Sequence, residues 1–124
     1  MDIILTNAGG QPIYDQIVSQ IKAQILSGKL KEGDALPSLR TLAKDLRISV
    51  ITTKRAYEEL ERDGFIETVT GKGSFVAAQN AELLREEALR RTEQALRGAV
   101  DTARQGGVTD SEVREMLELV LEGE

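Results

Sequence analysis

The stretch SLRTLAKDLRISVITTKRAYEEL, residues 38–60, decides the fold of this 124-residue chain. It contains two short helical patterns of apolar residues, and only residues 47–49 separate them. Ser38 and Ser49 each stand directly before one pattern, where a hydroxyl can accept a hydrogen bond from a free backbone N–H. Two short helices joined by so tight a turn predict a helix-turn-helix.

Each of these helices has an inner face that its spacing defines. The first carries Leu39, Leu42, Ala43 and Leu46, and spans about nine residues. The second directs four residues inward, namely Thr53, Ala56, Tyr57 and Leu60, and ends at Gly64. Its outer or lateral face is then left to Val50, Ile51, Lys54 and Arg55.

The segments on either side complete a larger motif. Upstream, Pro12 suits the first turn of a helix that Gly28 ends, and a polar connector with Gly33 and Pro37 follows. Downstream, the apolar period changes to two at residues 65–69 and 74–76, around a glycine-rich turn. Three helices followed by a β-hairpin predict a winged helix-turn-helix, a mainly α fold with one small hairpin.

The rest of the chain has no strand pattern. A long helix is expected over about residues 80–104, and glycines at 106 and 107 end it. A last helix begins at Thr109, which has the capping-box spacing to Glu112. We therefore expect a winged domain over residues 1–77 and a two-helix appendage over residues 78–124.

The long helix, about 37 Å at 1.5 Å per residue, has an apolar stripe too long for the last helix to cover. A second copy related by a two-fold axis would cover the remainder. The alternative is a monomer in which both helices fold back on the winged domain. The residues expected in the dimer contact are Leu84, Ala88, Ala95, Ala99, Ala103, Leu117, Val120 and Leu121.

The composition excludes most catalytic chemistry. There is no Cys and no His, so disulfides, thiolate metal sites and the commonest general base are absent. The acidic residues are spread along the chain like solvated faces, and we expect no enzyme, no metal and no cofactor. No signal peptide and no apolar run of about 20 residues are present, which predicts a cytoplasmic protein without a membrane partner.

The net charge of −5 conceals an uneven distribution. Residues 1–76 are neutral, and all of the excess acid lies beyond them. One basic cluster stands out against a single acid, Asp45, and consists of Arg40, Lys44, Arg47, Lys54 and Arg55. Because this cluster coincides with the helix-turn-helix, the acidic total does not argue against a nucleic-acid partner.

Residues 12–76 resemble the N-terminal DNA-binding domain of GntR-type bacterial transcription regulators. The resemblance rests on Pro12-Ile13-Tyr14, Leu36-Pro37-Ser38, Leu42-Ala43, Ala56-Tyr57 and Gly71-Lys72-Gly73, in this order and spacing. Only 48 residues follow Val76, which is similar to the YtrA branch, whose short helical appendage dimerises. The resemblance implies a dimeric repressor that binds double-stranded DNA at a palindromic operator. The sequence does not identify a small-molecule effector.

The architecture and the resemblance together place a set of residues on the DNA. The third helix enters the major groove with its N-terminal residues, and the hairpin follows as the wing. Arg40 lies in the first turn of its helix, where the helix dipole makes a positive charge unfavourable. This cost suggests that Arg40 binds an external anion, and the family pattern, which places a DNA-contacting arginine here, agrees. The expected DNA-binding residues are Ser38, Arg40, Ser49, Val50, Ile51, Thr52, Lys54, Arg55, Thr70, Gly71, Lys72 and Gly73.

Several of these residues have a second interpretation. Ser38, Ser49 and Thr52 could act as helix caps alone, and the Gly71-Lys72-Gly73 turn could be an ordinary hairpin turn. Val50 and Ile51 could contact thymine methyl groups and favour A·T pairs, or could pack on the preceding helix. Lys54 and Arg55 could contact guanines or phosphates.

Two wider alternatives remain beside these. The rival function is a winged helix that assembles proteins without specific DNA reading. Two tail helices leave no evident room for a cavity of about 300 Å³ or more within one chain. An effector would then bind between protomers or be absent.

Overall fold

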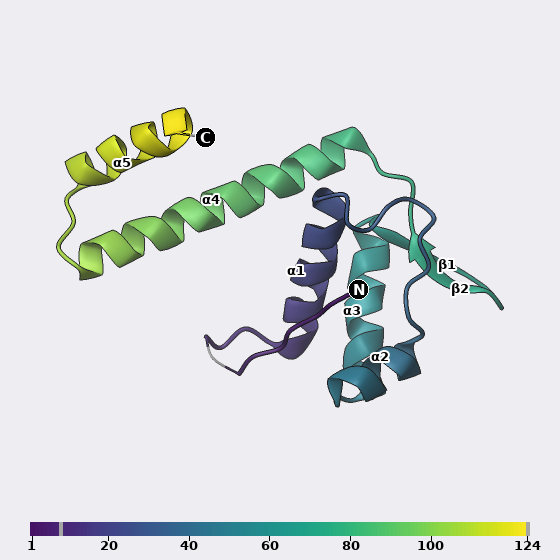
Figure 1. Cartoon of the computed structure of the whole chain (residues 1–124). Coiled ribbons are helices and arrows are strands. Elements are labelled where there is room, and N and C mark those ends of the chain that lie inside the picture. Colours follow the sequence, from purple (N-terminus) through teal and green to yellow (C-terminus); the bar gives the residue numbers. More distant parts are fainter. Residues whose placement is uncertain (8, 124) are drawn as a thin grey trace. The chain divides into compact units, whose positions relative to one another are not determined.

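The computed structural model describes residues 1–7 and 9–123. Its elements in chain order are α1 (Ile13–Leu26), α2 (Leu39–Leu46), α3 (Val50–Arg62), β1 (Ile66–Val69), β2 (Gly73–Val76), α4 (Ala81–Gln105) and α5 (Asp110–Gly123) (Figure 1). The chain divides into two compact units, one up to Ala81 and one from Glu82 onward. The expected winged helix-turn-helix, mainly α with one hairpin and two further helices, is confirmed.

The core of the first unit lies between α1 and α3, with α2 packed against α3. Ile17, Ile21 and Leu60 are completely buried there. The whole predicted inner face of α3 is buried, and Thr53 and Ala56 are inaccessible to solvent. At the far end, the Lys22 ammonium forms an ion pair of 2.9 Å with Asp63, which ties α1 to the end of α3.

Both serines cap their helices as predicted. The Ser38 hydroxyl accepts a hydrogen bond of 3.1 Å from the backbone N–H of Thr41, and that of Ser49 accepts one of 3.1 Å from Ile51. Pro12, in contrast, is one residue from its expected place. It precedes the first helical residue of α1, and its carbonyl accepts from the N–H of Gln16.

The wing contains more backbone pairing than its sequence indicated. β1 and β2 are antiparallel, with Ile66 opposite Val76 and Val69 opposite Gly73. The connector before α2 also pairs with β2: the N–H of Leu36 donates to the Ser74 carbonyl, at 2.9 Å. The polar connector thus holds the base of the wing next to the start of α2, although its sequence has no strand alternation.

The second unit consists of α4, α5 and the turn between them (Figure 1). The predicted capping box is confirmed, because Thr109 Oγ1 accepts from the N–H of Glu112 and the Glu112 carboxylate accepts from the N–H of Thr109. This backbone hydrogen bond from Thr109, followed by that from its hydroxyl, lowers the pKa of Glu112. Among the described residues, no helix is long and apolar enough to span a membrane.

Candidate nucleic-acid interface

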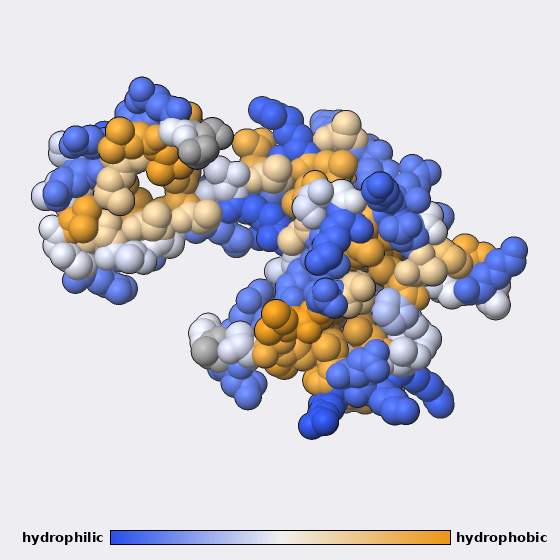
Figure 2. All heavy atoms as spheres, viewed as in Figure 1, coloured by the Kyte–Doolittle hydropathy of each residue, from blue (hydrophilic) through white to orange (hydrophobic). Residues whose placement is uncertain are grey.

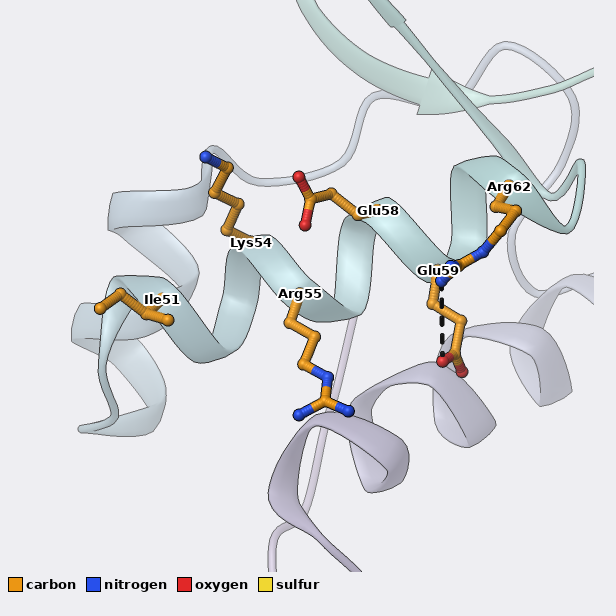
Figure 3. Close-up of a pocket in the computed structure, with 6 residues that line it drawn as sticks. All are labelled: Ile51, Lys54, Arg55, Glu58, Glu59 and Arg62. Atoms are coloured by element: carbon orange, nitrogen blue, oxygen red, sulfur yellow. Dashed lines mark ion pairs between the residues drawn. The ribbon is translucent and has the colours of Figure 1, made fainter.

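The outer face of α3 forms a shallow exposed surface along the helix (Figure 3). Its first two turns carry apolar and basic side chains, and its later turns carry two carboxylates and one more arginine. Among the described residues the only ion pair on this face is that of Arg62 with Glu59, at 4.0 Å. The residues that line the surface are Ile51, Lys54, Arg55, Glu58, Glu59 and Arg62.

Val50 and Ile51 stand at the first two positions of α3. Their exposed fractions are 41% and 80%, so neither is buried against α2. Large apolar side chains are unfavourable in water unless a partner covers them. The structure therefore leaves these side chains free for a partner at the helix N-terminus.

Lys54 and Arg55 are both exposed but point in different directions (Figure 3). Lys54 makes no ion pair with Glu58, although the two are four residues apart on one face. The Arg55 guanidinium lies over the ring of Tyr14 on α1, with its central carbon 3.8 Å from the ring centroid. Thr52, beside them, is half-buried.

The buried hydroxyls of Thr53 and Tyr57 fix α3 in place. The sequence predicted that both residues lie in the core, but it did not predict the hydrogen bonds that they make. Thr53 Oγ1 shares its proton between the Leu39 carbonyl at 3.1 Å and the Val50 carbonyl of its own helix at 2.9 Å. The Tyr57 hydroxyl donates to the Pro37 carbonyl at 2.8 Å. Burial raises the pKa of the Tyr57 hydroxyl, which therefore stays protonated and remains a donor. These bonds attach α2 and the connector to the helix that presents the exposed face.

The start of α2 presents Ser38 and Arg40. Besides accepting from the N–H of Thr41, the Ser38 hydroxyl donates to Thr41 Oγ1 at 2.8 Å. Arg40 is exposed and, in the described part of the chain, has no carboxylate partner. Ser38 is thus occupied as a cap, whereas the charge of Arg40 remains available to an anion.

The wing tip consists of Thr70, Gly71, Lys72 and Gly73, all exposed. The N–H of Lys72 donates to the Val69 carbonyl at 2.9 Å, which closes the turn. Gly71 has φ +79°, a left-handed conformation that glycine adopts without steric cost. The turn leaves the Lys72 ammonium unpaired among the described side chains.

The residues expected in a dimer contact all lie in the second unit. Ala103 is buried at 9% exposure and offers little surface to a partner. Leu84 is half-buried, and the remaining six are exposed: Ala88, Ala95, Ala99, Leu117, Val120 and Leu121.

An apolar hollow of about 600 Å³ opens between α4 and α5, where the sequence suggested no room of this size. Its walls include Leu96, Val100, Val113 and Met116. The hydrophobic lining is visible in Figure 2. The expectation was wrong, because apolar side chains that line this space, such as Leu96 and Val120, stay exposed instead of packing together.

Comparisons with known proteins agree with this geometry. Residues 13–76 match the family described as bacterial regulatory proteins, gntR family. The HTH-type transcriptional repressor YtrA of Bacillus subtilis (strain 168) is 36% identical over 106 residues, which are 86% of this chain and 82% of YtrA.

Two solved structures extend the comparison. A transcriptional antiterminator from Listeria monocytogenes EGD-e has a TM-score of 0.71 and 32% identity, and the match covers 98% of this chain and 91% of that one. The DNA-binding domain of AraR in complex with operator ORX1 has a TM-score of 0.55 and 25% identity, over 62% of this chain and 96% of that one. Over 86% of its length the chain is similar to the repressor YtrA, and it belongs to the gntR family of bacterial regulatory proteins.

Proposed function

We propose that this protein is a dimeric repressor of transcription that binds an inverted-repeat operator, with residues 1–77 binding DNA and residues 78–124 joining two copies. The observation that carries the proposal is the outer face of α3, where exposed apolar and basic side chains stand on a helix whose other face is buried. A helix presented in this way fits the major groove.

The charges along α3 indicate how the helix enters the groove. Lys54 and Arg55 lie in its first two turns, whereas Glu58, Glu59 and Glu61 follow in the next. Carboxylates close to phosphates are repelled, so the N-terminal half of α3 enters the groove and the acidic half stays outside. The A·T preference would then come from Val50 and Ile51, whose methyl groups can contact those of thymine.

The other expected contacts flank this helix. Arg40 at the start of α2 and Lys72 at the wing tip have no carboxylate partner within residues 1–7 and 9–123, and each would contact a phosphate. Ser49 and Thr52 stand at the N-terminus of α3, where the positive end of the helix dipole favours a phosphate. Phosphate contacts of this kind fix the position of the reading helix without selecting a sequence.

Dimerisation is supported by the apolar surface of the second unit. Leu117, Val120 and Leu121 are 41%, 71% and 70% exposed on one short helix. A second copy would bury this surface and the hollow beside it, and a two-fold axis would present two reading helices to one duplex. Repression is inferred from the similarity to YtrA, a repressor.

A selection from random duplexes tests the proposal. We expect the full-length protein to enrich an inverted repeat whose half-sites lie about 10 base pairs, or a multiple, apart. The double variant Val50→Ala, Ile51→Ala should lose the A·T preference within each half-site. If no sequence is enriched, the protein-interaction module is the better account and the proposed function fails.

A further inference from the structure

The contact between Tyr14 and Arg55 joins α1 to the exposed face of α3 (Figure 3 shows Arg55 directed toward α1). The guanidinium carbon lies over the ring, 3.8 Å from its centroid, which is well within the range of a cation–π contact and close enough for the guanidinium to stack on the ring. Tyr14 is half-buried at the second position of α1, and Arg55 is exposed. The ring therefore limits the orientations that the guanidinium can adopt.

The stack leaves the charge of Arg55 unneutralised. Glu58 and Glu59 stand three and four residues further along α3, at the spacings where helical ion pairs form. Arg55 nevertheless makes no ion pair and no hydrogen bond among the residues described, and Glu59 pairs with Arg62 instead. Because stacking uses the flat face of a guanidinium, the N–H donors on its edge remain available.

The position of the stack determines which part of a duplex it can reach. Tyr14 meets Arg55, and Lys22 meets Asp63 eight residues later on both helices, so α1 and α3 run parallel. Tyr14 thus lies beside the N-terminal half of α3, and Arg55 is directed sideways from that half toward α1. An α-helix about 10–12 Å across fills a major groove about 12 Å wide, so a side chain directed sideways reaches the phosphates at its rim, not the bases.

We propose that Arg55 is a phosphate anchor at the rim of the groove, and that Tyr14 is a positioning residue that acts on DNA through Arg55. The proposal rests on the function proposed above and gives two neighbouring cations different roles. Lys54 faces the groove, and Arg55 binds the phosphate backbone of the DNA. A lysine at position 55 has no flat face to stack and would lose the fixed geometry.

The test measures dissociation constants over a salt series for the selected operator and for an unrelated duplex. Arg55→Ala should weaken both duplexes by about the same factor, roughly tenfold at low salt, and should lower the salt slope by about one per protomer. Tyr14→Leu should weaken both about two- to fivefold, whereas Tyr14→Phe, which keeps the ring, should bind like the parent. In the Arg55→Ala background, Tyr14→Leu should have no further effect.

The outcomes are distinguishable. If Tyr14→Leu lowers the melting temperature but leaves the DNA affinity and the salt slope unchanged, the stack is only a clamp between α1 and α3, and the proposal is overturned. Loss of binding confined to the operator would also overturn it, because Arg55 would then read bases. If the parent protein itself shows no salt-dependent DNA binding, the proposed function has failed, and this result appears before any variant is made.

Discussion

The two units of this protein use apolar residues in opposite ways. In the first unit the apolar faces of α1, α2 and α3 meet one another, and Ile17, Ile21 and Leu60 are inaccessible to solvent. In the second, Ala103 is the only apolar residue buried among those described. Amphipathic helices are present in both, so periodicity alone does not show where a face is buried. The first unit buries its apolar faces within one chain, whereas the apolar residues of the second unit stay largely exposed.

The largest effect, on the dimer dissociation constant, is expected from charged residues introduced on α5 of the second unit. Leu117→Glu with Val120→Glu would place carboxylates in the proposed dimer contact, at a cost of at least about 3 kcal/mol, or more than 100-fold in the dimer dissociation constant. Sedimentation at micromolar concentration should show monomers. The control Glu118→Gln, on the same helix, should stay dimeric. If the double glutamate variant also stays dimeric, the contrast between the two units is contradicted.

The next largest effect belongs to the closed core. Ile21→Ala should lower the free energy of unfolding by about 2–5 kcal/mol, because the lost methyl groups leave a cavity. Ile4→Ala is the matched control, since Ile4 is 79% exposed, and it should change the stability by less than about 0.5 kcal/mol. Urea unfolding followed by circular dichroism measures both free energies. If the two variants lose equal stability, Ile21 does not belong to a packed core in the first unit.

A smaller effect is expected from the hydroxyl that ties the connector to α3. Tyr57→Phe should cost about 1 kcal/mol, because the Pro37 carbonyl loses its donor. Tyr14→Phe removes a hydroxyl that makes no hydrogen bond in the described structure and should be neutral. Thermal unfolding compares the stabilities of the two variants directly. Similar losses of stability would indicate that the hydrogen bond of the Tyr57 hydroxyl does not stabilise the fold.

The smallest effect concerns the capping box of α5. Its hydrogen bonds lower the pKa of Glu112, so the folded state binds its proton less readily than the unfolded state. The stabilisation is then complete above the ordinary pKa of a glutamate and is lost as the pH falls through the lowered value. Helicity should decrease over this acidic range in the parent and less in Glu112→Gln, and equal pH profiles would count against the cap.

Most of the fold followed from short signals in the sequence. Serine caps, glycine stops and the change of period placed every helix and both strands within about one residue, because these features act locally. The hydroxyl bonds of Thr53 and Tyr57 and the stack of Arg55 on Tyr14 depend on how α1, α2 and α3 come together. Spacing along one helix carries no information about such contacts.

The extended segment before α1 shows the same limit. Four residues of helix rise about 6 Å, close to the rise of two extended residues, so glutamines on one face of α1 can hold alternate backbone groups of this segment. The sequence contained both partners but no sign of their pairing. The side-chain amides donate to backbone carbonyls as follows: Gln16 to Thr6, Gln20 to Ile4 and Gln24 to Asp2.

The central claim is that the first unit binds DNA and the second unit dimerises. It is tested most directly by the affinities of the parent and of the double variant Leu117→Glu, Val120→Glu for two duplexes. One duplex carries the selected inverted repeat, and the other carries a single half-site. We expect both proteins to bind the half-site alike, and only the parent to gain about 100-fold or more on the full repeat. If the variant loses the half-site as well, or keeps the gain on the full repeat, binding and dimerisation are not divided between the units as proposed.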